Sequence, residues 1–350
     1  MNMDRYAKQL ILPEIGPDGQ QRIGQGRVLC VGAGGLGCAS LPYLAGAGVG
    51  RITIIDPDIV DRTNLQRQVL FGESDLGQPK ADVAVRRLGD LNPDIELVAR
   101  PERLDTDNVE ALFGQHDVVI DGSDNFATKY LVGDASTKFG IPLVYGSATG
   151  MEALVTLFVP GQGPCLRCLF PEAPTGWVPN CAEAGVLGPL VGAAGCVQAM
   201  EAIKWLVGNE QSGLESLNGR LWTMDARDMS VRRLAVRRRS DCPGCSIPPE
   251  AITLQALPVQ IAEIDFDEIE SLDNPVLIDV READEYQAGH LPGAINRPLS
   301  GLKAGECILP ESGVCVLYCT VGMRSREAIR LNHSPHGPTL INLRGGLQAV

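Results

Sequence analysis

The stretch Arg27-Val-Leu-Cys-Val-Gly-Ala-Gly-Gly-Leu-Gly37 decides the fold of the first part of the chain. Residues 27–31 are mostly apolar and β-prone, and the glycines open a segment with helical periodicity through Leu41 and Leu44. A second apolar run, 51–55, ends in Asp56. This order of strand, glycine turn, helix, strand and acid is typical of a phosphate-binding unit, because glycines let the backbone approach closely and a helix N-terminus offers free N–H groups.

The later apolar runs predict the fold class and the domains. Runs at 117–120 and 143–145 each end in a glycine-containing turn, so the first domain is predicted to be α/β and Rossmann-like, with a mostly parallel sheet and helices on both faces. A proline-containing segment at 246–258 interrupts this pattern, and new strands follow at 276–280 and 314–318. The predicted organisation is a first domain at 1–246, a linker at 247–260 and a smaller α/β domain at 261–350.

Composition argues against several classes of protein. The 350 residues carry a formal charge of −13, which would repel nucleic acid, and 44 % of them are apolar, enough for two cores. No run approaches twenty apolar residues, and residues 1–12 lack a signal-peptide layout, so we expect neither a membrane span nor export. Eleven cysteines, four of them in pairs with metal-type spacing, favour a reduced, cytoplasmic location.

The glycine turn alone leaves two kinds of nucleotide enzyme open. It would also suit a nicotinamide dehydrogenase in which Asp56 holds a ribose. The residues downstream favour an adenylating enzyme, because Arg67 and Lys80 could neutralise a triphosphate and Asp124 could hold Mg²⁺ on it. Surface ion pairs are the ordinary alternative for Arg67 and Lys80. We predict ATP and Mg²⁺ as the cofactors.

Two Cys-x-x-Cys pairs, Cys165/Cys168 and Cys242/Cys245, have the spacing of a tetrahedral four-thiolate Zn²⁺ site. One pair alone could be redox-active or incidental. A closed four-thiolate site leaves no ligand position open, so we predict a structural zinc that pins the end of the first domain to its middle. Five other cysteines lie in apolar patterns and are predicted to be packing residues: Cys30, Cys38, Cys196, Cys307 and Cys315.

Two further cysteines are candidates for chemistry. Cys319 follows a predicted strand and precedes a helix expected near Ser325, so loop N–H groups and the helix dipole would favour its thiolate or persulfide, with Arg324 adding positive charge. A phosphatase would use a similar loop. Cys181 lies in a glycine- and proline-rich loop next to polar residues, where it is either reactive or a spare thiol.

Longer motifs accompany the glycine turn and the cysteine pairs: Arg5-Tyr-Ala-Lys-Gln-Leu-Ile-Leu12, Asn64-Leu-Gln-Arg-Gln68, Gly77-Gln-Pro-Lys80, Asp124-Asn125 and Cys181-Ala-Glu-Ala-Gly185. With them, residues 1–246 resemble the ubiquitin-activating-enzyme-like family, in its molybdopterin-synthase adenylyltransferase and thiamine-pathway branch. The resemblance implies an ATP site formed by Gly32, Gly34, Gly35, Asp56, Thr63, Asn64, Leu65, Gln66, Arg67, Lys80, Asp124 and Asn125.

The same resemblance implies a homodimer in which each N-terminal segment reaches the partner's nucleotide site. There Lys8 stands where the family usually has an arginine, and it keeps the charge without the planar two-pronged geometry. The resemblance also implies that Cys181 holds the substrate protein covalently or exchanges with a persulfide.

The later part contains Leu277-Ile-Asp-Val-Arg-Glu282, Gly289-His-Leu-Pro-Gly-Ala-Ile-Asn296 and Tyr318-Cys-Thr-Val-Gly-Met-Arg-Ser325. With these motifs it resembles a single rhodanese domain. The resemblance implies that Cys319 carries a persulfide beside Arg324, and we predict structural roles for Asp279 and His290. The sequence after Gly345-Gly346 is shorter than the terminal helix usual in rhodanese domains.

Together the resemblances imply a reaction in two stages. ATP activates the C-terminal glycine of a small ubiquitin-like sulfur-carrier protein ending in Gly-Gly, and Cys319 then delivers sulfur, directly or through Cys181, to give a thiocarboxylate. A cysteine desulfurase or thiosulfate would load Cys319. Two alternatives stay open: an adenylyltransferase with an inactive rhodanese domain, and a non-catalytic scaffold that binds the carrier.

Overall fold

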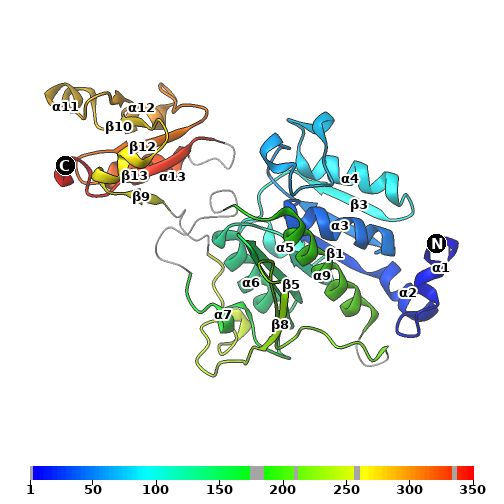
Figure 1. The fold of residues 1–350 in the computed structure, drawn as a ribbon. Helices are drawn as coiled ribbons and strands as arrows, with labels where there is room; N and C mark the ends of the chain where they lie inside the picture. The colour runs from blue at the N-terminus through cyan, green and yellow to red at the C-terminus, as the bar shows by residue number, and fades with distance from the viewer. Residues whose placement is uncertain (1–2, 174–184, 209–211, 256–260, 333–336) are drawn as a thin grey trace. The chain divides into compact units, whose positions relative to one another are not determined.

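The computed structural model describes residues 3–173, 185–208, 212–255, 261–332 and 337–350 (Figure 1). These residues form two compact units, one containing the described residues up to 255 and the other those from 261 onward. Each unit has its own sheet and its own hydrophobic core.

The larger unit contains an eight-stranded sheet in the order β3-β2-β1-β4-β5-β6-β7-β8. The five strands from β3 to β5 are parallel, and β6, β7 and β8 extend the sheet in antiparallel pairs. The strands are β1 (Arg27–Val31), β2 (Arg51–Ile55), β3 (Glu96–Arg100), β4 (Val118–Asp121), β5 (Leu143–Thr149), β6 (Glu152–Phe158), β7 (Arg220–Asp225) and β8 (Ser230–Ala235).

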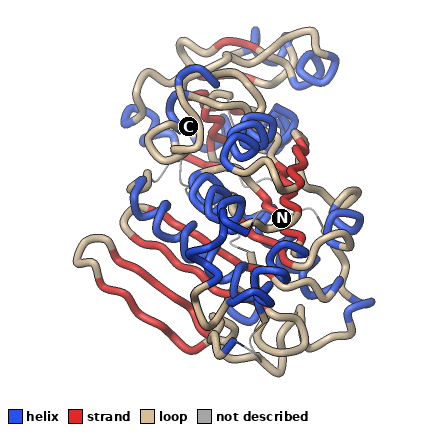
Figure 2. Tube along the Cα trace, turned by 90° about the vertical axis from the view of Figure 1, so that its right-hand side faces the viewer, coloured by secondary structure: helices blue, strands red, loops and turns tan. Residues whose placement is uncertain are grey.

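Helices pack on both faces of this sheet, because successive strand residues point to opposite sides. Val28 and Cys30 pack with residues of α3, α4 and α9, whereas Leu29 and Val31 pack with residues of α5 and α6. In Figure 2 the strands (red) of this unit run among its helices (blue). The α-helices are α1 (Ala7–Leu10), α2 (Gly16–Gln25), α3 (Gly35–Ala47), α4 (Lys80–Leu91), α5 (Val109–Phe113), α6 (Phe126–Phe139), α7 (Leu166–Leu169) and α9 (Gly188–Val207). Short 3-10 turns lie at η1 (Met3–Tyr6), η2 (Arg62–Asn64), η3 (Glu73–Asp75) and η4 (Pro249–Ala251).

Among the helices in the described part of the chain, α9 alone is long and apolar enough to cross a membrane by length and composition. Half of its apolar window is buried, and it packs against α3, β5 and β6. The apolar character of α9 is therefore explained by its place in the core of the larger unit.

The smaller unit is built on a five-stranded parallel sheet in the order β11-β10-β12-β13-β9. Its strands are β9 (Ala262–Ile264), β10 (Val276–Asp279), β11 (Ile295–Asn296), β12 (Val314–Tyr318) and β13 (Thr339–Leu343). Its helices are η5 (Phe266–Ser271), α11 (Ala283–Ala288), α12 (Leu299–Ala304), α13 (Met323–Asn332) and η6 (Gly346–Ala349).

The predicted α/β class with a mostly parallel first sheet is confirmed. The strands predicted at 27–31, 51–55 and 314–318 coincide with β1, β2 and β12. The strand predicted at 143–145 was too short, since β5 continues to Thr149 because its second half pairs with β6. The strand predicted at 117–120 lies one residue further on, as β4.

Candidate functional site

The turn between β1 and α3 is tight enough to require glycine. Gly32 has a φ of +93°, and a Cβ there would lie 2.9 Å from the carbonyl oxygen of Gly122, in the turn after β4. A Cβ on Gly37 would lie 2.2 Å from the oxygen of Gly32. At the N-cap of α3, Gly34 brings no side chain to accept hydrogen bonds from the first turn of the helix. These N–H groups are therefore available to an anion at the carboxyl edge of the sheet. The turn lies at the point in the strand order where β1 has β2 on one side and β4 on the other.

Asp56 braces this turn from the end of β2. Its carboxylate accepts hydrogen bonds from the N–H of Ala33 at 2.6 Å and of Asp58 at 2.8 Å. Burial raises the pKa of Asp56, and the nearby charge of Lys80 opposes that shift. Each oxygen accepts one N–H bond and so retains a lone pair for a ribose hydroxyl.

The two predicted phosphate-binding cations lie on neighbouring segments. Lys80 begins α4, is buried, and has its Nζ 3.0 Å from Asp58 Oδ2. The side chain of Arg67 lies beside Gly35, where its Cγ is 3.5 Å from the position a Cβ would take. Its guanidinium donates to Asn64 Oδ1 at 2.9 Å and to the Thr63 carbonyl at 3.3 Å. The structure thus places Arg67 against the glycine turn and holds Lys80 with a neighbouring acid.

The remaining residues predicted to bind the nucleotide lie either in the segment that contains Arg67 or in the turn after β4. Leu65 is partly buried and Gln66 is exposed. Asp124 is exposed, and within the described part of the chain it makes no hydrogen bond or ion pair. Asn125 is the N-cap of α6, and its side chain accepts from the N–H of Thr128 at 2.9 Å. Gly122 packs against Gly32 in the glycine turn, and Asp124 comes two residues after Gly122 in the chain.

Two residues of this site were not predicted. Gln68 is buried and donates to Asn64 Oδ1 at 3.1 Å, while its Oε1 finds no partner among the described residues. Lys129 forms a buried ion pair with Asp121 and donates to the Gly146 carbonyl, which fixes the end of β4. Gln68 could have been predicted, because it ends the Asn64-Leu-Gln-Arg-Gln68 motif. Lys129 could not, because its contacts are tertiary and belong to no motif in the sequence.

The four predicted zinc cysteines converge on one point. Their sulfur atoms all lie within 4.8 Å of one another, with Cys165 and Cys242 at 3.5 Å and Cys168 and Cys245 at 3.4 Å. Four thiolates around a tetrahedral Zn²⁺ at about 2.3 Å would be separated by about 3.8 Å. Burial and the neighbouring thiols raise the pKa of Cys165, so four bare thiolates here require a cation.

Backbone groups complete the cysteine cluster. The N–H of Gly244 donates to Cys242 Sγ at 3.4 Å, and the N–H of Arg239 donates to Cys168 Sγ at 3.5 Å. Such bonds to the ligand sulfurs orient them and spread their negative charge. The donor set therefore fits a zinc ion in chemistry and in spacing.

Cys319 lies between β12 and α13 in the smaller unit and is buried. Its Sγ accepts a hydrogen bond from the Gly322 N–H at 3.1 Å and lies 3.7 Å from the Ser325 hydroxyl. Burial alone would raise the pKa of this thiol. The hydrogen bonds from Ser325, Val321 and Arg324 outweigh burial and leave the pKa of Cys319 below its ordinary value. The loop is therefore built to hold a sulfur anion.

Sulfur transfer should consequently persist below the pH at which an ordinary thiol ionises. Because the pKa of Cys319 is lowered, the thiolate is present above that pKa and activity is lost as pH falls through it. The acidic limb of the pH–rate profile for loading of Cys319 by thiosulfate should lie below pH 9.0, the ordinary thiol value. The rate at which the protein gains one sulfur from thiosulfate, followed by intact mass across pH, would measure this. An acidic limb at or above pH 9.0 would contradict the assignment.

Arg324 is predicted to add positive charge beside the sulfur, but its guanidinium is already engaged. Its two terminal nitrogens lie 2.6 Å and 2.7 Å from the two oxygens of Glu285, which lies in the first turn of α11. Glu285 was not predicted as a site residue. The pairing holds the pKa of Glu285 at about 2, so this carboxylate is ionised throughout the physiological range.

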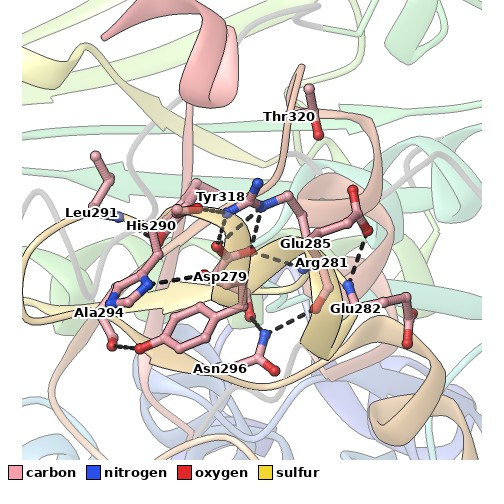
Figure 3. A network of polar contacts seen from close by, with 12 residues as sticks. Asp279, Arg281, Glu282, Glu285, His290, Leu291, Ala294, Asn296, Tyr318 and Thr320 are labelled. Atoms are coloured by element: carbon pink, nitrogen blue, oxygen red, sulfur yellow. Dashed lines mark hydrogen bonds and ion pairs between the residues drawn. The ribbon is translucent and has the colours of Figure 1, made fainter.

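Polar contacts behind the loop hold the smaller unit together (Figure 3). Asp279 and Arg281 form a buried ion pair, and Arg281 also donates to the Gly289 carbonyl. The ring of His290 stacks on Tyr286 with centroids 3.8 Å apart. Both Asp279 and His290 thus make contacts of the structural kind that was predicted.

The other cysteines fall into two groups. Cys181 lies outside the described residues, so the structure is silent on its role. Of the predicted packing cysteines, Cys30, Cys38 and Cys315 are buried, whereas Cys196 and Cys307 are partly buried.

The two units belong to different protein classes: the larger has the architecture of an adenylating enzyme of the ubiquitin-activating type, and the smaller that of a rhodanese domain. The family model described as the ThiF family matches residues 6–244, and the model described as a rhodanese-like domain matches residues 265–350. The chain belongs to the ThiF family and carries a C-terminal rhodanese-like domain. This membership supports ATP as the nucleotide of the glycine turn.

The chain is similar to proteins over its whole length or over the larger unit alone. The probable adenylyltransferase/sulfurtransferase MoeZ of Mycobacterium tuberculosis is 39 % identical over 363 residues, covering 99 % of this chain and 92 % of that protein. The SAMP-activating enzyme E1 of Haloferax volcanii is 47 % identical over 244 residues, covering 69 % of this chain and 88 % of that protein. The crystal structure of E. coli MccB with ATP superposes with a TM-score of 0.61 at 22 % identity, covering 70 % of this chain and 75 % of that one, and so supports the fold. The protein is an enzyme of the adenylyltransferase and sulfurtransferase class.

Proposed function

We propose that this enzyme adenylates the C-terminal glycine of a small ubiquitin-like sulfur-carrier protein ending in Gly-Gly, and that Cys319 then supplies the sulfur of a thiocarboxylate. One observation carries the proposal: a single chain holds an anion-binding glycine turn with Arg67 and Lys80, and a separate loop that stabilises a cysteine thiolate. Similar proteins include a sulfur carrier protein adenylyltransferase of Thermus thermophilus, 46 % identical over 253 residues.

In the adenylation step the carrier carboxylate attacks the α-phosphorus of ATP, and pyrophosphate leaves with the electron pair of the broken P–O bond. The N–H groups at the start of α3 face the phosphates, and Arg67 and Lys80 stabilise the charge that develops on them. Asp56 accepts from the ribose. Mg²⁺ would be held by the Asp124 carboxylate, and when bound it neutralises phosphate charge.

In the sulfur step the terminal sulfur of a Cys319 persulfide attacks the carbonyl carbon of the acyl-adenylate, and AMP leaves. The product is an acyl disulfide on Cys319. A second thiol must attack the Cys319 sulfur to release the thiocarboxylate, and we assign that role to Cys181. A separate reductant, such as a small thiol, then regenerates the two cysteines. We take a cysteine desulfurase or thiosulfate as the donor that loads Cys319.

We further propose a homodimer. Large apolar side chains are exposed at Ile11, at Tyr43 on α3 and at Met200 on α9, with 73 %, 61 % and 53 % of their surface accessible. Contact with a second copy would cover such side chains. Arg5 is engaged with the Leu91 carbonyl and lies 3.9 Å from Asp94, so among the described residues before α2 the exposed Lys8 is the cation available to a partner's phosphates.

The zinc proposal predicts a stability effect with a matched control. Cys242→Ser should remove zinc from the purified protein and lower the melting temperature of the larger unit, since the metal ties the loop after β8 to α7. Cys196→Ser, in α9, removes a thiol outside the cluster and should retain zinc. Metal analysis and thermal unfolding of both variants give the answer. Wild-type protein that folds without zinc would refute the proposal.

The function itself is tested by ATP–pyrophosphate exchange. With a candidate carrier ending in Gly-Gly the purified enzyme should exchange label between pyrophosphate and ATP, and a carrier lacking its last glycine should not support exchange. A non-catalytic scaffold would bind the carrier without exchange. An adenylyltransferase with an inactive rhodanese domain would exchange, yet form no thiocarboxylate when a sulfur donor is added.

A further inference from the structure

The mouth of the Cys319 loop carries a guanidinium that is already neutralised. Arg324 stands five residues after Cys319, and both its terminal nitrogens are directed at the carboxylate of Glu285. Each of the two side chains is 34 % exposed, so the pair lies at the surface of the loop and not in the core. A two-pronged pair of this kind fixes the guanidinium plane and occupies its strongest donors.

The neighbouring arginines are paired as well. Arg281 is held by Asp279 and the Gly289 carbonyl, and Arg326 lies 2.7 Å from Glu263. None of these three arginines, 281, 324 and 326, therefore presents an unshared positive charge. A small dianion approaching the loop would meet backbone N–H groups around the sulfur and carboxylates beside them.

The rim of the loop is apolar on its outer side. Val321 is 46 % exposed and Met323 is 66 % exposed, and both lie between Cys319 and Arg324 in sequence. Burying such side chains against a donor is favourable, whereas a hydrated dianion gains nothing from them.

From these three observations we infer that Glu285 is a specificity-determining residue, which withholds the Arg324 guanidinium from dianionic sulfur donors and so favours donors of low charge. The inference rests on the proposed role of Cys319 as a sulfur acceptor. Glu285 acts through Arg324 and is a positioning residue, not one that touches the reacting sulfur.

The reactions with the two donors differ in the charge of the leaving group. Both are attacks of the Cys319 thiolate on a sulfur atom that break one S–S bond. With thiosulfate, the Cys319 thiolate attacks the outer sulfur, the S–S bond breaks, and sulfite leaves as a dianion with its electron pair. With an alkyl persulfide, the same attack on the terminal sulfur releases a thiolate with a single negative charge. A free guanidinium at the loop mouth would therefore assist thiosulfate more than it assists a persulfide.

Glu285→Gln tests this inference because it keeps the size and one acceptor oxygen of the side chain and removes the charge. The full-length enzyme would be loaded under single-turnover conditions with thiosulfate, or with the persulfide of N-acetylcysteine methyl ester, and the gain of one sulfur measured by intact mass against a Cys319→Ala blank. The ratio of the second-order rate constant for loading by thiosulfate to that for loading by the neutral persulfide should rise by about tenfold, mainly because half-saturation is reached at a lower thiosulfate concentration. High salt should reduce the gain.

Two further variants make the result specific. Glu327→Gln removes a carboxylate from the same helix as Arg324, where it pairs with Lys303, and should leave the donor ratio as in wild type. In the double variant Glu285→Gln/Arg324→Met the gain should disappear, since no guanidinium is left to release. An unchanged donor ratio in Glu285→Gln, or a gain that survives in the double variant, would overturn the inference alone. Failure of the wild-type enzyme to take sulfur from either donor would overturn the proposed sulfur transfer and the inference with it.

Discussion

Cys319→Ala is expected to abolish transfer of sulfur from thiosulfate or a persulfide to cyanide, by more than about 10⁴-fold, because it removes the nucleophile that the loop is built to ionise. ATP–pyrophosphate exchange should be unchanged, since the glycine turn belongs to the other compact unit and acyl-adenylate formation involves no thiol. Thiocyanate release and pyrophosphate exchange would be measured on the same preparation.

Cys307→Ser serves as the control for loss of a thiol from the smaller unit. Cys307 is partly buried, and burial raises its pKa, whereas the pKa of Cys319 is lowered. The control should retain sulfur transfer. Sulfur transfer that survives in Cys319→Ala would mean that another cysteine carries the persulfide.

Asp124→Asn is expected to lower carrier-dependent ATP–pyrophosphate exchange by about 10²- to 10³-fold, because the substitution removes the charge proposed to hold Mg²⁺ on the triphosphate. The fold should be unaffected, since Asp124 is exposed and makes no ion pair or hydrogen bond within the described residues. Asp107→Asn removes another exposed acid from the same unit and should exchange at the wild-type rate. Exchange by Asp124→Asn close to the wild-type rate would reject the assignment, particularly if raised Mg²⁺ concentrations had no effect.

Local patterns were sufficient to predict the framework of the nucleotide site. The strand at 27–31 and the glycines after it specify one turn, because only glycine can occupy Gly32 and Gly37 without collision. The paired spacing of Cys165/Cys168 and Cys242/Cys245 likewise predicted a cluster, which folding brings together across the 73 residues of the chain that lie between positions 168 and 242. In both cases the chemistry depends on residue types close in sequence.

Features that depend on pairing between separate segments of the chain were missed. The extension of β5 to Thr149 follows from its antiparallel partner β6, which the apolar pattern alone did not indicate. The pairing of Arg324 with Glu285 joins residues 39 positions apart. The motif around Cys319 therefore predicted the positive charge of Arg324, but it did not predict that Glu285 neutralises that charge. Asp56 was predicted to contact the nucleotide, and the structure adds that it braces the glycine turn through Ala33.

The central claim is that one chain both adenylates a carrier and gives it sulfur. The most direct measurement is the intact mass of a Gly-Gly-ended carrier after incubation with the wild-type enzyme, ATP, Mg²⁺, a reductant and a persulfide donor. We predict replacement of one oxygen by sulfur at the carrier C-terminus, dependent on ATP and lost in both Cys319→Ala and Asp124→Asn. A carrier that becomes adenylated with the same donor present, yet gains no sulfur, would contradict the claim.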